Sequence, residues 1–388
     1  MLNFNDTAIA FKSKTNKELL RSYWLFKLIG SKAIVKIGAF ITLLALKIKL
    51  PIKGMIRATI FKQFCGGETV EQSSHAIKNL GDFNIGTILD YSIEGKTLDH
   101  EFDQTVLEII RTIDKGKNEA NIPFAVFKVT GIARIEELEK ISFAIENKLE
   151  IDKTLAEPIF NRINTICLAA FTNQVRIFID AEESWIQACL DEWCFQLMLL
   201  YNKEKAIVYN TLQMYRHDRL AYLKECHEMA KEHQFIYGIK LVRGAYMEKE
   251  RERALKMNYL DPIQVNKEAT DSDFNKAMEF ILENIADFAL VAGTHNEESA
   301  LILTQLMEKH AIDSASPSIY FSQLLGMSDH ISYNLANAGF NVAKYVPYGP
   351  IEEVMPYLLR RANENTSVAG QTSRELKLIQ QERKRRRL

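Results

Sequence analysis

The sequence predicts an α/β protein whose main part is a closed (β/α)8 barrel of the TIM type, preceded by an N-terminal helical extension. Eight short apolar runs of strand length alternate with longer stretches of helical pattern. Nearly every run ends in a charged or hydrogen-bonding residue, as expected where strand ends form an active-site face. An open doubly wound sheet is disfavoured, because the GxGxxG turn expected after its first strand is absent.

The first region, residues 1–81, shows helical spacing at 17–28 and 31–48 and no convincing strand. The apolar stretch Ile37–Leu46 is too short to cross a bilayer, which takes about 20 residues. Lysines at positions 27, 32, 36, 47, 49 and 53 surround it. We expect a helix packed on the protein; the alternative is an amphipathic helix on a membrane surface.

The barrel is expected over residues 82–370, with a basic tail over 371–388. Its strands are expected within 86–91, 124–130, 175–183, 206–213, 236–246, 288–296, 318–326 and 341–349. Their mostly continuous apolar character suits a parallel sheet buried on both faces. Helices are expected between them, for example over 275–288, and again in SRELKLIQ near the end. The run RKRRR (383–387) is expected to be a solvated, frayed tail.

Composition excludes several classes of function. The formal net charge is −1 and the pI is about 6.7, so no global field attracts nucleic acid, and we expect no nucleic-acid partner. The five cysteines form no CxxC pair and no secretory signal precedes them, which indicates reduced thiols, mostly in the core. We therefore expect a cytoplasmic protein, with peripheral contact at the inner face of the membrane as the alternative.

The polar residues at the strand ends predict a lined pocket, because Lys and Asp are costly inside a barrel unless paired or used on a ligand. They are Asp90, Lys128, Asp180, Asn210 with Gln213, Arg243, His295, Gln323 and Tyr345.

Arg360 and Arg361 follow the last strand, and two guanidinium groups beside Lys128 would make a strong carboxylate site. The plain alternative is a surface pair bridging to Glu352, Glu353 or Glu364. No metal is expected, because His295 has no second His or Cys near it in sequence. These patterns predict a barrel enzyme that binds a carboxylate and an anionic cofactor, without fixing the reaction.

Five segments carry a resemblance to a known family. KLVRGAYMEKERERA (240–254), GTHN (293–296), QLLGM (323–327), KYVPYG (344–349) and YLLRRANENTS (357–367) resemble the signature set of the monofunctional, mitochondrial-type proline dehydrogenase family. The likeness runs from residue 88 through Ser367. It implies non-covalent FAD, hydride transfer from C5 of L-proline to flavin N5, the product Δ1-pyrroline-5-carboxylate, and a quinone as electron acceptor.

The resemblance also implies roles for individual residues. Arg360, Arg361 and Lys128 match a clamp for the proline carboxylate, and Tyr246, Leu325 and Tyr345 match the wall around the ring. Asp180 matches an acid near the substrate end of the flavin that orients Lys128 or Tyr345. The matches to cofactor contacts are Asn210, Lys240, Arg243, Gly244, Ala245, Lys267, Thr270, His295, Gln323 and Glu364.

Several points stay open in the resemblance. Some relatives carry Arg and Lys where this chain has Lys240 and Arg243, so either could contact flavin N5, and relatives often have Gln where Asn210 stands. Tyr345 favours proline over hydroxyproline, since hydroxyproline-specific relatives tend to have a smaller residue there. Glu94 is a candidate gate that would pair with Arg360. The alternatives are a dehydrogenase of another cyclic imino acid, such as hydroxyproline, and a silent barrel that binds FAD or proline as a sensor.

Overall fold

A computed structural model describes residues 2–48, 50–91, 96–367 and 371–388; the side chains of residues 32, 34, 43, 47, 362–367 and 371–373 lie outside the description. The chain divides into two compact units. The terminal unit consists of Met1–Glu94 and Gln323–Leu388, and the central unit of Gly95–Ser322. The expected boundaries at residues 81 and 370 stay a prediction.

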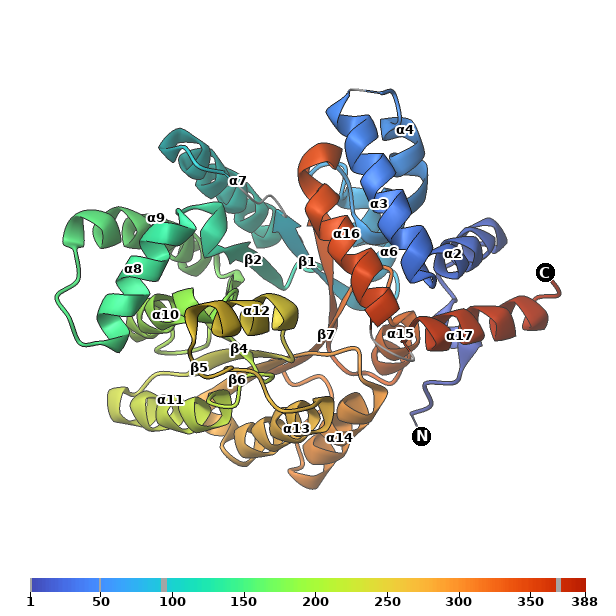
Figure 1. The fold of residues 1–388 in the computed structure, drawn as a ribbon. Helices are drawn as coiled ribbons and strands as arrows, with labels where there is room; N and C mark the ends of the chain where they lie inside the picture. Colours follow the sequence, from blue (N-terminus) through green and yellow to red (C-terminus); the bar gives the residue numbers. More distant parts are fainter. Residues whose placement is uncertain (1, 49, 92–95, 368–370) are drawn as a thin grey trace. The chain divides into compact units, whose positions relative to one another are not determined.

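Eight strands close in chain order into one parallel barrel, which confirms the predicted fold (Figure 1). They are β1 (Ile85–Tyr91), β2 (Phe124–Lys128), β3 (Arg176–Asp180), β4 (Val208–Gln213), β5 (Tyr237–Val242), β6 (Phe288–Gly293), β7 (Ile319–Leu324) and β8 (Val342–Tyr348). Seven of them lie inside the predicted apolar runs, and β1 begins one residue before the run 86–91. Most of their residues are buried, as expected for a parallel sheet covered on both faces.

Helices separate the strands of the central unit. They are α7 (Asp99–Lys117), α8 (Ile135–Glu146), α9 (Lys153–Asn173), α10 (Gln187–Tyr201), α11 (Arg219–His233), α12 (Met247–Met257), α13 (Lys267–Glu283) and α14 (Glu297–Lys309). Two of them begin at asparagine caps: Asn266 accepts from Ala269 N at 2.8 Å, and Asn296 accepts from Glu298 N at 2.8 Å. The expected helix over 275–288 corresponds to the second half of α13, followed by a 3-10 turn, Ile285–Asp287.

The terminal unit is helical around β1 and β8. Its helices are α1 (Thr7–Ala10), α2 (Asn16–Ile29), α3 (Lys32–Lys47), α4 (Lys53–Ile56), the π-helical turn η1 (Arg57–Phe61), α5 (Lys62–Phe64), α6 (Ser74–Gly81), α15 (Asp329–Asn337), α16 (Ile351–Ser367) and α17 (Gln371–Arg385). The two expected N-terminal helices are α2 and α3. A capping box between Thr15 and Glu18 starts α2.

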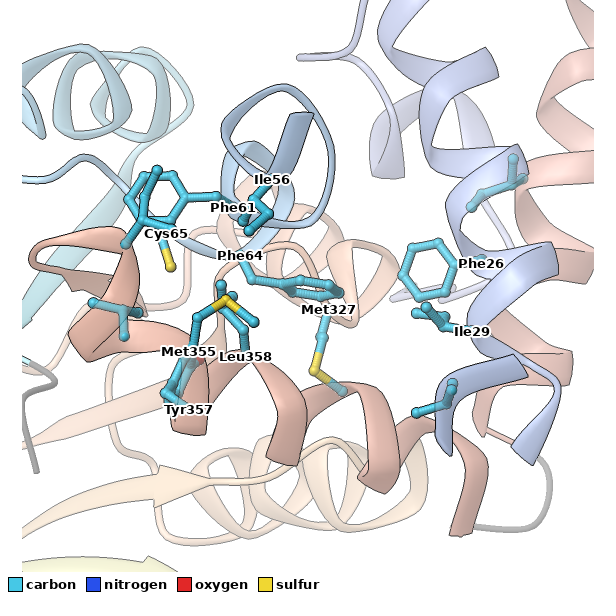
Figure 2. Packing of buried hydrophobic residues seen from close by; sticks show 14 of the residues in the cluster. Phe26, Ile29, Ile56, Phe61, Phe64, Cys65, Met327, Met355, Tyr357 and Leu358 are labelled. Carbon is cyan, nitrogen blue, oxygen red and sulfur yellow. The ribbon is translucent and has the colours of Figure 1, made fainter. Parts of the chain in front are cut away.

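A buried cluster of apolar side chains joins the N-terminal helices to α16 and α17 (Figure 2). Phe26 of α2 and Phe64 of α5 meet edge to face, with ring centroids 6.5 Å apart. Met327, just after β7, belongs to the same cluster, as do Leu358 of α16 and Leu378 of α17. Segments from both ends of the sequence therefore share one core within this unit.

The expectation that the basic run is frayed is wrong, although Lys384, Arg385 and Arg387 are exposed to solvent as expected. Residues 383–385 belong to α17, where Leu378 and Ile379 are buried. Beyond the helix, the Arg386 guanidinium donates to Phe11 O at 2.8 Å and to Lys14 O at 2.7 Å. These bonds hold the residue that follows α17 against the segment between α1 and α2, so the basic run is the end of a helix that docks on the N-terminal region.

The outer face of α3 is apolar and open to solvent. Ile37, Phe40, Ile41, Leu44 and Ile48 are between 47% and 68% exposed, and their spacing places them on one side of the helix. Val35 and Ala45 on the other side are buried, so α3 does pack on the protein, as expected. Over the described part of the chain, every helix is too short or too polar to span a bilayer.

All five cysteines are free and buried, which confirms that expectation. Cys65 lies in the terminal unit, and Cys167, Cys189, Cys194 and Cys226 lie in the central unit. Burial raises the pKa of each thiol above its ordinary value.

Candidate active site

An aromatic layer identifies the inner face of the central strands. Phe124 of β2 stacks on Phe178 of β3 at 4.6 Å between ring centroids, and meets Tyr320 of β7 edge-on at 4.9 Å. β2 and β7 are not neighbours in the barrel, so this second contact crosses its interior. Tyr209 of β4 joins the layer 5.5 Å from Phe178. Every second residue onward from these rings faces the same interior.

This alternation brings three predicted site residues together at the carboxyl ends of the strands. Lys128 and Asp180 stand opposite each other in the β2–β3 register. Lys240 of β5 makes an ion pair with Asp180, and its ammonium lies 5.2 Å from the centroid of the Phe178 ring. Two cations and one carboxylate thus share the inner face, and the Lys240–Asp180 pair is largely removed from solvent.

Asn210 does not join them. It lies on the opposite face of β4, where its Nδ2 donates to Asp191 Oδ1 of α10 at 2.8 Å and its Oδ1 accepts from Thr211 N. Gln213 is on the inner face, three residues further on, and its Nε2 donates to Glu182 O at 2.6 Å. Polar residues within one apolar run cannot be assigned to the inner or the outer face of the barrel without the strand register.

Arg243, just after β5, is fixed by three side chains. Its guanidinium donates to Asp271 Oδ1 at 2.6 Å, to Thr294 Oγ1 at 2.6 Å and to Ser299 Oγ at 2.8 Å. It also lies 4.5 Å from the centroid of the Phe274 ring. The strand end is thereby tied to α13 and α14, which gives the cation one orientation.

Asp271 shares its charge between two cations. Partial burial alone would raise the pKa of Asp271, but hydrogen bonds from Lys267 and Arg243 outweigh it, so the pKa lies below its ordinary value. Lys267, at the start of α13, is largely exposed. Thr270 is buried and donates to Asn266 O at 3.3 Å. These side chains belong to one face of the loop and helix that follow α12.

Gly244 is a position that only glycine fits. Its φ is +128°, and a Cβ there would lie 2.5 Å from Tyr215 Cδ1. Gly244 and Ala245 are exposed, so their backbone is open to a ligand. Tyr246, at the start of α12, and His295, between β6 and α14, are half-buried.

A buried acid, Glu182, was not assigned from sequence. Burial raises its pKa to about 7, while hydrogen bonds from Thr130 and the charge of Lys128 oppose that rise. Thr130 follows β2 two residues after Lys128. The signal in the sequence was the acidic stretch DAEE that continues beyond Asp180.

The other predicted residues lie in the terminal unit. Tyr345 of β8 is 9% exposed, and its carbonyl accepts from Leu325 N at 2.8 Å. Gln323 of β7 is buried and its Oε1 accepts from Ser332 Oγ of α15 at 2.8 Å. Asp90, near the end of β1, is also buried. Their burial means that these residues also have a structural role, in addition to any contact with a ligand.

Arg360 and Arg361 are half-buried on α16. The Arg361 guanidinium lies 5.2 Å from the centroid of the Tyr357 ring. Glu352, one of the carboxylates weighed as a surface partner, pairs with Lys53. The Glu364 side chain and the whole of Glu94 lie outside the described residues, so the gate stays a prediction. Among the described residues, no group of three His, Cys, Asp or Glu side chains could hold a metal ion.

Comparison with known proteins gives a consistent result. The family model described as proline dehydrogenase matches residues 73–374. The chain is 33% identical to a protein named proline dehydrogenase 1, mitochondrial, from Dictyostelium discoideum, over 98% of this chain and 74% of that protein. It is 29% identical to a protein named hydroxyproline dehydrogenase from Xenopus laevis, over 99% of this chain and 90% of that protein.

A solved structure supports the fold. Proline utilization A (PutA) from Bdellovibrio bacteriovorus, inactivated by N-propargylglycine, superposes with a TM-score of 0.73 at 19% identity. The match covers 93% of this chain but only 38% of that one, so this chain is similar to a part of the larger protein. Family, enzyme class and barrel fold are thus as the signature segments implied: the chain belongs to the proline dehydrogenase family, the members of which are oxidoreductases.

Proposed function

We propose that the protein oxidises L-proline to Δ1-pyrroline-5-carboxylate, with FAD bound non-covalently and a quinone as the final electron acceptor. One observation carries the proposal within this family. Lys128, Asp180 and Lys240 share the inner face at the carboxyl ends of the strands, where a barrel enzyme has its active site. When bound, the flavin supplies the hydride acceptor at N5.

The residues around Arg243 fit an anionic flavin dinucleotide. Arg243 is a fixed cation, Lys267 is an exposed one, and the exposed backbone at Gly244 and Ala245 permits close approach. We propose that they hold the cofactor together with Lys240, Thr270, His295 and Glu364; Gln323 is left out because its side chain faces α15, where its Oε1 accepts from Ser332 Oγ. Gln213 takes the place first assigned to Asn210, because its side chain is on the inner face.

The substrate is held at two ends. Lys128, Arg360 and Arg361 bind the carboxylate, which stays anionic throughout, so this clamp acts by orientation rather than on new charge. Tyr246, Leu325 and Tyr345 enclose the ring and exclude water from the carbon that loses hydride. Asp180, as the partner of Lys240, keeps that ammonium aimed along the inner face.

The substrate is proline rather than hydroxyproline. With Tyr345 packed against the ring, as the family resemblance implies, an added 4-hydroxyl would clash with its nearly buried side chain. A relative named for hydroxyproline keeps the question testable.

The test is a visible spectrum of the purified protein, before and after anaerobic addition of L-proline. Flavin bands that bleach with proline, and not with trans-4-hydroxyproline, are the expected result. Bands that bleach only with hydroxyproline would reverse the substrate assignment. A protein that cannot be reconstituted with FAD would refute the function, although the barrel would stand.

A second proposal concerns the exposed face of α3, which we assign to an anionic membrane surface. No Asp or Glu stands between Glu18 and Glu68, while lysine and arginine recur throughout that segment. A helix that is apolar on both sides is normally buried on both sides. The described part of the chain buries one side of α3 and leaves the other side exposed. Apolar residues flanked by lysines suit the headgroup region of a bilayer at the inner face of the cytoplasmic membrane.

Co-sedimentation with vesicles of phosphatidylglycerol and phosphatidylcholine tests the assignment. Replacing Phe40 by Ser should weaken binding roughly tenfold, because one large side chain no longer enters the bilayer. Leu255→Ser, at a residue 84% exposed in the central unit, is the matched control and should leave binding unchanged. The membrane assignment would be overturned if the wild-type protein did not bind vesicles at low salt, or if it formed a dimer that buries the exposed face of α3.

A further inference from the structure

The turn between β7 and α15 has its backbone held from several sides. Leu325 N donates to Tyr345 O at 2.8 Å. Leu324 O and Met327 O accept from Lys344 Nζ at 3.3 Å and 2.7 Å. Ser328 N donates to Glu375 of α17. A short turn with this many backbone bonds has little freedom to change shape.

The N-terminal region adds a further hold. Gln63 of α5 donates from Nε2 to Gly326 O at 3.0 Å, and its own Oε1 accepts from Ser22 Oγ at 3.1 Å. The turn fits closely against α5: Gly326 has φ +75°, and a Cβ on it would lie 2.2 Å from Gln63 O. Only glycine permits this approach.

Gln63 is itself fixed by its neighbours. Phe61 and Phe64 on either side of it are buried in the apolar cluster that also contains Met327 of the turn (Figure 2). The preceding residues, Arg57–Phe61, form the π-helical turn. Such turns are rare in proteins, and those that occur are often found at functional sites. The carboxamide of Gln63 is therefore held in place by buried neighbours where it donates to the turn.

Lys344 is a charged residue in a buried position, which packing alone does not explain. Its side chain is 1% exposed and its ammonium lies 2.8 Å from Asp329 Oδ1, which in turn receives Lys14 at 3.1 Å on its other oxygen. Burying such charges is costly unless they are fully bonded. Here the ammonium donates two of its hydrogen bonds to backbone carbonyls of the turn.

We propose that Gln63, Lys344 and Glu375 are positioning residues that hold this turn in the one shape that places Leu325 against the substrate ring. The inference rests on the proposed function through the role of Leu325. It gives α5 and α17, from opposite ends of the sequence, a part in recognition of the ring that acts through the turn they hold. The N-terminal region thereby gains a role in recognition of the ring.

The test separates the ring from the carboxylate. Cyclopentanecarboxylate and acetate are used as competitive inhibitors of proline oxidation, since both offer a carboxylate and only the first offers a ring. In Gln63→Leu, the Ki of cyclopentanecarboxylate should rise about fivefold and that of acetate should stay within about twofold, from the loss of one hydrogen bond to the turn. Glu375→Leu should behave alike, and Glu375→Gln, which keeps the acceptor for Ser328 N, should be close to wild type.

Asn202→Leu is the matched control. Asn202 is another buried carboxamide, and it bonds Val208 O and Ile236 O at the amino ends of β4 and β5, away from the active-site ends. It should lower stability without changing the ratio of the two Ki values. An equal change in that ratio, or equal effects of Gln63→Leu on both inhibitors, would overturn the proposal.

Hydrogen exchange of the full-length protein provides a readout that needs no activity. In Gln63→Leu, the peptide covering residues 324–328 should exchange several times faster, and in Asn202→Leu it should not. Unchanged exchange in Gln63→Leu would show that the turn is not held by this residue and would overturn the inference. Faster exchange in a protein that does not oxidise proline would instead refute only the proposed function and the link to the ring.

Discussion

Replacing Lys240 by Met should destabilise the protein by several kcal/mol, because it removes a buried cation that is ion-paired with the Asp180 carboxylate inside the barrel. The two side chains are 5% and 14% exposed. Met keeps most of the volume of the lysine stem, so the change removes charge with little loss of packing.

The magnitude follows from the geometry. Removing one member of a buried ion pair typically costs 3–5 kcal/mol, and the residual exposure of Asp180 places this pair at the lower end, about 3 kcal/mol. Loss of the ammonium over the Phe178 ring adds about 1 kcal/mol. The double variant Lys240→Met, Asp180→Asn removes the carboxylate charge as well and should recover about 2 kcal/mol.

Urea unfolding of the flavin-free protein, for wild type, both single variants and the double variant, measures the coupling between the two sites. Lys276→Met is the control, because Lys276 is largely exposed and its ion pair with Asp273 is long, at 3.9 Å. This variant should lower the free energy of unfolding by less than about 1 kcal/mol. If Lys240→Met cost no more than this control, or if the single losses simply added in the double variant, the reasoning would be refuted.

Three further predictions concern other residues at the strand ends. Gly244→Ala should cost about 2 kcal/mol or more and lower the melting temperature, because its Cβ would strike the Tyr215 ring at a φ of +128°; a variant as stable as wild type would contradict the strain argument. The pKa of Glu182 is raised to about 7 by burial, so stability is fully present below its ordinary value of 4.5 and is lost as pH rises through about 7. Urea unfolding of flavin-free protein should lose up to about 3 kcal/mol of stability from this group between pH 5 and pH 8, and Glu182→Gln should remove that part of the slope; an unchanged slope would exclude Glu182 as its source. Tyr345→Ser should shift the ratio of kcat/KM for trans-4-hydroxyproline over proline upward by roughly tenfold or more, and an unchanged ratio would remove this residue from the ring wall.

Much of the fold could be predicted from the sequence. Every strand coincides with an expected run to within one residue, because short apolar runs separated by helical patterns are typical of buried parallel strands. The inner face was harder. Asn210 and Gln213 are both polar and near the end of the same strand, and only the register shows that Asn210 faces α10.

Pairings between distant residues could not be predicted at all. Nothing local in the sequence joins Asp180 to Lys240, or Arg386 to the end of α1, because these contacts depend on how far-apart segments pack. The basic run near the C-terminus was assigned to solvent for the same reason: its charge pattern is that of a free tail, and its carbonyl partners lie more than three hundred residues away.

The burial of every thiol makes the cysteines natural reporters of local opening. A buried thiol with a raised pKa is nearly inert to a disulfide reagent until its surroundings open. Cys65 reports on the terminal unit, and the other four cysteines report on the central unit. Mass spectrometry of a timed labelling reaction would therefore rank the opening rates of the two units without any engineered probe, and would show whether they unfold as one body or in sequence.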